Sequence, residues 1–236
     1  MSSTVFPSII LGIKQFFLNG FRAFPLVLGI TAFILAFFQT NIAFILLFAA
    51  IAFAVPISTT MLNLVLEFII TKTSIPSHLW QIPVTGACTI VGSAGLSAAP
   101  TSIFALPTFW LSSVVFFFSY LAINGFSLYN RDSESTADES KVSARKTQAL
   151  MGAILSIITG LAFIIIRVTV TGCESVIGIV TALLTMIPLA YGWYRLAAAC
   201  GADRLVDLFG IANGLLPMSA KSSTPYVCVK DVDPTL

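Results

Sequence analysis

Long apolar runs, separated by short polar breaks, dominate the pattern of hydrophobic and polar positions along this chain. A hydrocarbon core about 30 Å thick is crossed by roughly 20 mainly apolar residues of helix. Four runs meet that requirement and a fifth comes close to it. The runs cover about residues 25–38, 42–61, 107–129, 149–170 and 177–196. This pattern predicts an all-α integral membrane protein with about five transmembrane helices, two hairpins plus one.

Polar and irregular segments lie between these spans. Residues 1–22 carry apolar side chains at helical spacing, with Lys14 and Arg22 between them. Such spacing is typical of an amphipathic helix on the membrane surface, and a marginal extra span is the alternative. The expected organisation is an amphipathic interfacial segment (1–22), a transmembrane hairpin (23–70), an irregular Pro/Gly/Ser-rich connection (71–106), a third transmembrane helix (107–129), a polar charged loop (130–148), a second transmembrane hairpin (149–196) and a short soluble C-terminal docking tail (197–236).

Composition supports a membrane environment. Hydrophobic residues make up 57% of the chain and charged residues 9%, and the mean hydropathy is +0.98. A water-soluble globule would lack the polar groups needed to cover its surface, so the lipid bilayer is the expected partner of most of that surface. The net charge of +2 is too small to indicate nucleic-acid binding.

Cysteine spacing gives no sign of a metal or redox site. Cys88, Cys173, Cys200 and Cys228 are far apart, and His78 is the one histidine. Without a C-x-x-C pair or an imidazole partner, the sequence predicts free thiols, no metal and no cofactor. The chain also contains no Asn-x-Ser/Thr acceptor for glycosylation.

Side chains that could carry chemistry are few. The glycine-rich stretch 86–95 lacks the spacing and the lysine of a phosphate-binding loop, and no Ser-His-Asp arrangement can be built around His78. We therefore expect no catalytic residues and a protein that is not an enzyme. Glu67 is the best candidate for a functional charge in a span, at a depth predicted to be interfacial.

Three structural features follow from the spacing of polar and small residues. Arg167 and Glu174 flank the turn of the second hairpin, so we expect an ion pair or a cap on that turn, with a gating pair as the alternative. A stripe of small residues in the fourth span should let another helix approach closely; it contains Gly152, Ser156 and Gly160. Trp80 and Trp110, near the two ends of the connection, suit the headgroup level.

Basic residues predict the orientation. With five spans, the 131–146 loop and the C-terminal tail lie on the same side of the membrane. That side holds Arg131, Lys141, Arg145, Lys146, Arg195, Arg204, Lys221 and Lys230, whereas the other holds Lys14, Arg22, Lys72 and Arg167. The positive-inside rule therefore predicts that the loop and the tail lie in the cytoplasm.

Two segments of the chain resemble segments of membrane proteins that are encoded by viruses. They are FPLVLGITAFILAFFQTNIAFILLFAAIAFAVP and WYRLAAACGADRLVDLFGIANGLLP, which together cover about a quarter of the chain, and the more specific element is CG-x-x-R-x-x-D-x-FG from Cys200 to Gly210. They resemble uncharacterised membrane proteins encoded by large nucleocytoplasmic DNA viruses of algae and protists. The resemblance implies a structural component of the virion inner membrane that contacts minor capsid proteins.

These observations favour a non-enzymatic membrane scaffold whose C-terminal tail docks onto a protein partner. The tail is too short to fold alone yet carries apolar anchors between charged residues. The candidate docking residues are Arg204, Leu205, Asp207, Leu208, Phe209 and Tyr226. The alternative is a small channel or transporter, which would work as a homo-oligomer because so few polar groups cannot line a wide pore alone.

Overall fold

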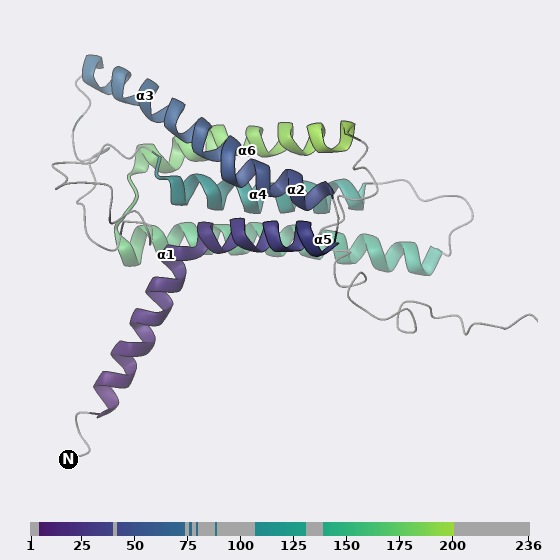
Figure 1. Ribbon diagram of the computed structural model, residues 1–236, viewed down its shortest axis with the longest axis horizontal. Helices are drawn as coiled ribbons and strands as arrows, with labels where there is room; N and C mark the ends of the chain where they lie inside the picture. The colour runs from purple at the N-terminus through teal and green to yellow at the C-terminus, as the bar shows by residue number, and fades with distance from the viewer. Residues whose placement is uncertain are drawn as a thin grey trace, which may run out of the picture.

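The computed structural model describes residues 5–39, 42–73, 76, 79, 88, 107–130 and 139–200. The helices are α1 (Val5–Gln39), α2 (Ile42–Ala49), the π-helix η1 (Ala50–Ala54), α3 (Val55–Thr73), α4 (Phe109–Tyr129), α5 (Glu139–Ile166), the π-helix η4 (Arg167–Thr171) and α6 (Val176–Ala199). Helices α2, η1 and α3 follow one another without a break, as do α5 and η4, so these residues form five long helices (Figure 1).

All five helices are long and apolar enough to cross a membrane, which confirms the predicted fold class. The last three of these helical stretches differ from the predicted spans by only a few residues. They are Phe109–Tyr129, Lys146–Thr171 and Val176–Ala199. The first two, Lys14–Phe38 and Ile42–Thr73, are longer than the predicted spans. The molecule is therefore an α-helical, multi-pass membrane protein.

Helix α4 is the centre of the bundle. It has the largest buried share of the five helices, and its most extensive contacts are with α5 and α6. Aromatic rings from α1, α4 and α5 meet at one end of the bundle; these are Phe21, Phe24, Trp110, Phe118 and Phe163. Figure 1 shows the helices side by side, with the N-terminal part of α1 and the end of α3 leaving the bundle at the same end.

Small residues allow α4 and α5 to pack closely. The buried side of α5 along its first four membrane turns consists of Ala149, Ala153, Ser156 and Gly160. A Cβ atom on Gly125 of α4 would lie 2.8 Å from the Ala149 carbonyl oxygen, and one on Gly160 would lie 3.0 Å from Cβ of Phe118. The small-residue stripe predicted in the fourth span thus has a partner within the chain, and the close helix is α4.

The start of α5 and the end of α3 differ from the predicted boundaries, and α1 runs unbroken from Val5 to Gln39 across the boundary predicted after residue 22. Helix α5 begins at Glu139, so residues 139–148 are helical, whereas the sequence predicted a loop over 130–148. The segment Ala144–Lys146 consists of strong helix formers, and the membrane helix that follows supplies the costly helical nucleus. At the other boundary, α3 continues to Thr73, three residues into the predicted connection. Residues 131–138 and most of 74–106 lie outside the described residues.

The seam between α4 and α5 yields a prediction. Gly125→Ala places a methyl group against a backbone carbonyl, so the helices must move apart; overpacking of this kind costs about 1–3 kcal/mol. We expect a lower temperature of thermal unfolding, followed by circular dichroism in mild detergent. Gly192→Ala is the matched control, because its Cβ meets nothing within 4 Å. Equal unfolding temperatures for the two variants would refute the close seam.

Candidate functional site

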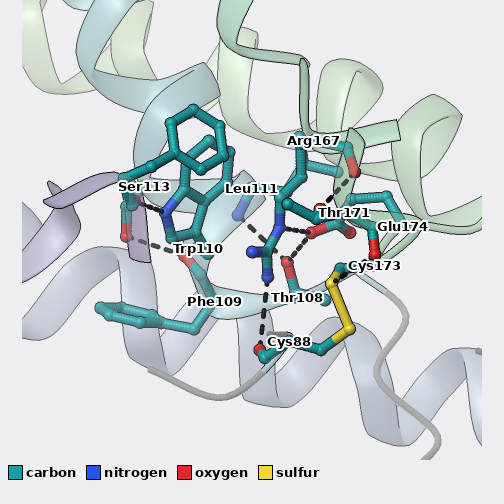
Figure 2. Close-up of polar contacts among 11 residues, drawn as sticks. Cys88, Thr108, Phe109, Trp110, Leu111, Ser113, Arg167, Thr171, Cys173 and Glu174 are labelled. Atoms are coloured by element: carbon teal, nitrogen blue, oxygen red, sulfur yellow. Dashed lines mark hydrogen bonds and ion pairs between the residues drawn. A yellow bond between two sulfur atoms is a disulfide. The ribbon is translucent and has the colours of Figure 1, made fainter. Parts of the chain in front are cut away.

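Buried polar side chains gather at one end of the bundle. We call Asn63, Thr108, Trp110, Arg167 and Glu174 the polar cluster. The end of the bundle that holds this cluster is called the disulfide end. The opposite end, where α4 and α6 end and α5 begins, is the loop end. Figure 2 shows Arg167 at the centre of the cluster, pointing toward Glu174, Cys88 and Trp110.

Arg167 is a charged group removed almost completely from solvent, with 1% of its surface exposed. Its Nε donates to Oε1 of Glu174 at 3.2 Å, and its Nη2 donates to the carbonyl oxygen of Cys88 at 3.3 Å. The guanidinium carbon lies 4.8 Å from the centre of the Trp110 ring, a cation–π distance. The ion pair confirms the prediction that Arg167 and Glu174 join across the turn of the second hairpin.

The sequence of the turn places these two side chains. Val168 to Thr171 are β-branched, which disfavours a regular α-helix, and the helix closes as the π-helix η4. Gly172 has φ of +61°, the left-handed conformation that glycine adopts without strain, and it ends the helix. Ser175 then caps α6, since its Oγ accepts a hydrogen bond from the Gly178 amide at 2.9 Å.

Glu174 connects this turn to α4. Its side chain is fully buried, and Oε1 accepts hydrogen bonds from both Arg167 and the hydroxyl of Thr108. Thr108 also caps α4 by accepting a hydrogen bond from the Leu111 amide at 3.1 Å. Burial raises the pKa of Glu174 above its ordinary value, while the Thr108 hydrogen bond and the Arg167 charge oppose that shift.

A disulfide joins Cys88 to Cys173, and the prediction of free thiols at these two positions was wrong. The two Cα atoms are 5.2 Å apart, although the residues are separated by 85 positions in the sequence. The bond holds the Cys88 carbonyl beside Arg167 (Figure 2). Cys200, at the loop end, is free as predicted, but it is exposed rather than buried; Cys228 lies outside the described residues.

Trp110 satisfies a backbone group that Pro25 leaves unpaired. A proline inside a helix removes the hydrogen bond to the carbonyl four residues earlier, which in α1 is that of Phe21. The indole Nε1 of Trp110 donates to this oxygen at 2.8 Å, a replacement that is valuable where water is scarce. Trp110 is therefore buried within the bundle, and its predicted depth at the headgroup level stays a prediction.

Every one of the five long helices reaches the polar cluster. Asn63 brings in α3, since its Nδ2 donates to the Pro107 carbonyl at 3.2 Å, and Trp110 brings in α1. Along the helix axes, Lys146 of α5 and Arg195 of α6 each lie about 30 Å from the polar cluster, because an α-helix advances about 1.5 Å per residue. The span equals the thickness of a bilayer hydrocarbon core. The cluster therefore fits one membrane boundary and the basic residues fit the other.

The predicted site residues fall into two groups. Glu67 is exposed on α3, one turn beyond the Asn63 contact and away from the centre of the bundle, and its interfacial depth stays a prediction. The six candidate docking residues between Arg204 and Tyr226 lie outside the described residues, so their role stays a prediction.

The charged groups of the polar cluster contact other parts of the fold. Within the described part of the chain, no group of three or more His, Cys, Asp or Glu side chains could hold a metal ion. Both charges of the cluster are used in contacts between elements of the fold. Sequence reasoning missed Thr108 and Trp110 as members and Cys88 as a neighbour of the cluster, because their contacts join segments far apart in the chain.

The buried ion pair predicts a non-additive pair of mutations. Arg167→Met leaves Glu174 as an unpaired buried acid, and loss of one partner in such a pair costs about 3–5 kcal/mol. The double variant Arg167→Met/Glu174→Gln should recover part of this loss in the free energy of unfolding, measured by denaturant titration in mild detergent. Arg195→Met, at an exposed arginine of α6, is the control and should be near neutral. Additive effects would contradict the pairing.

The Trp110 hydrogen bond predicts a rescue. Trp110→Phe keeps an aromatic ring but leaves the Phe21 carbonyl without its donor, which costs about 1–3 kcal/mol. In a Pro25→Ala background, residue 25 again has an amide for that carbonyl, so the same substitution should cost less. The two unfolding temperatures are compared with and without Pro25→Ala. An identical loss in both backgrounds would show that the freed carbonyl is not what Trp110 stabilises.

The chain was compared with known families, curated proteins and solved structures. No family model matches it, and no curated protein or solved structure matches it either.

Proposed function

We propose that this protein is a non-enzymatic structural component of a membrane, which anchors the bilayer to protein partners through its loop and its C-terminal tail at the loop end. The observation that carries the proposal is the polar cluster. It joins all five long helices at one end of the bundle through a buried ion pair, a disulfide and four hydrogen bonds between distant segments. Such cross-links suit a rigid anchor, since they oppose the helix movements of alternating access.

The bundle interior supports the same proposal. A groove of about 340 Å³ lies between α4, α5 and α6, and its walls are almost entirely apolar, with Phe118, Leu161 and Leu183 among them. An ion or a polar solute needs polar groups to replace its hydration shell. The groove is therefore suited to lipid chains, which any membrane anchor contacts.

A virion inner membrane is the setting that the viral resemblance implies. In that setting the partners are minor capsid proteins, which meet the loop or the tail. The tail sequence suits docking because Leu205, Leu208 and Phe209 alternate with charged residues over a segment too short to fold alone.

A small oligomeric channel or transporter is the second candidate. The observation that favours it is the π-helix η1 directly before Pro56 in the second span, because π-helical turns are frequent at functional sites. Reconstitution in liposomes separates the two candidates: ion or solute flux from purified protein favours the channel, and tight liposomes favour the anchor.

Tail removal tests the anchor. Deleting residues 201–236 should abolish co-sedimentation with large protein assemblies after mild detergent extraction, because the docking segment is lost. Membrane insertion, measured by resistance to carbonate extraction, should be unchanged. The triple substitution Leu205→Ser/Leu208→Ser/Phe209→Ser should reproduce the loss.

The matched control is Lys221→Ser/Lys230→Ser, which alters the same tail but keeps its apolar anchors and should co-sediment normally. Unchanged co-sedimentation of the truncated chain would contradict docking through the tail.

A further inference from the structure

We infer that the disulfide end faces an oxidising compartment outside the cytosol and that the loop end faces the cytosol, so that the partner docks from the cytosolic side. The statement about the partner rests on the proposed function. The orientation does not, and the experiment below measures the orientation alone.

The disulfide is the first argument. Cys88 belongs to the connection between α3 and α4, and Cys173 belongs to the turn between η4 and α6. With five membrane-crossing helices, both segments lie on the same side of the membrane, which the bond itself requires. Structural disulfides form and persist in the endoplasmic reticulum lumen, the periplasm or outside the cell, and they are rare in the cytosol. The disulfide end is thus assigned to an oxidising space.

The cysteine at the other end agrees with this assignment. Cys200 follows the last turn of α6 at the loop end, where it is exposed and unpaired. Among the described residues, the paired cysteines thus lie at one end and the exposed free thiol at the opposite end. A reducing cytosol keeps such a thiol free.

The distribution of basic residues is an independent argument, because it concerns insertion and not redox chemistry. The helices at the disulfide end carry Lys14, Arg22, Lys72 and Arg167, but its connecting segments, 74–106 and 172–175, contain no lysine or arginine. The loop end carries Arg131, Lys141, Arg145 and Lys146 before and at the start of the fourth span, with Arg195 and Arg204 around the end of the fifth. Short loops rich in basic residues stay in the cytosol.

The structure adds how the loop end is presented. The first turns of α5 extend past the ends of α4 and α6 in Figure 1, and they include Lys141 and Arg145. A basic helical segment therefore projects from the bundle on the side that also carries the tail. A partner that contacts both this basic segment and the tail must be a protein of the cytosolic side. The amino-terminal part of α1 lies on the opposite side.

Glycosylation mapping tests this orientation, because the chain has no acceptor of its own. Gly95→Asn completes an Asn-x-Ser acceptor with Ser97 in the connection, and Ser222→Asn completes an Asn-x-Thr acceptor with Thr224 in the tail. Each full-length variant is translated with sealed microsomes from the endoplasmic reticulum. We expect an endoglycosidase-sensitive shift for Gly95→Asn and none for Ser222→Asn, whereas a glycan on Ser222→Asn overturns the orientation.

Thiol labelling decides the result if neither variant is glycosylated. In a Cys228→Ser chain, Cys200 should react with a membrane-impermeant maleimide in intact microsomes. Reaction only after detergent overturns the orientation. Neither readout depends on a partner, so a correct orientation with failed docking would refute the proposed function alone.

Discussion

The cost of burying Arg167 is the constraint on which the structure depends. An arginine removed from water needs a counter-charge and hydrogen-bond acceptors, because the low dielectric makes an unpaired charge very costly. Glu174, the Cys88 carbonyl and the Trp110 ring supply these contacts from three separate parts of the chain. The contacts of one side chain therefore fix the second hairpin, the central helix and Cys88 relative to one another.

The same contacts explain how a very apolar chain keeps a defined arrangement in lipid. Apolar side chains alone give little drive for helix association there, since lipid tails are equally apolar. Close packing of small residues between α4 and α5 provides one specific contact. Polar bonds at the ends provide others, including the Trp193 indole, which donates to the Leu46 carbonyl at 3.0 Å near the loop end. An anchor that transmits a load between a membrane and a protein assembly benefits from such fixed contacts.

The sequence predicted what depends on local pattern. Hydropathy gave the five spans, and the short turn between the fourth and fifth placed Arg167 beside Glu174. It did not predict the disulfide, because no local spacing links residues 85 positions apart. The role of Trp110 was hidden for a similar reason: the unpaired Phe21 carbonyl is inferable from Pro25, but its donor comes from a helix much later in the chain. Hydropathy also placed the start of α5 too late, because the charged residues of its first turns do not prevent a helix.

The central claim is that the connection and the second hairpin meet on one side of the membrane around Arg167. The most direct test is mass-spectrometric peptide mapping of the protein, alkylated in its membrane before extraction and digested without reductant. The account predicts a disulfide-linked peptide pair that contains Cys88 and Cys173, together with alkylated Cys200. Recovery of Cys88 and Cys173 as separately alkylated peptides would contradict it.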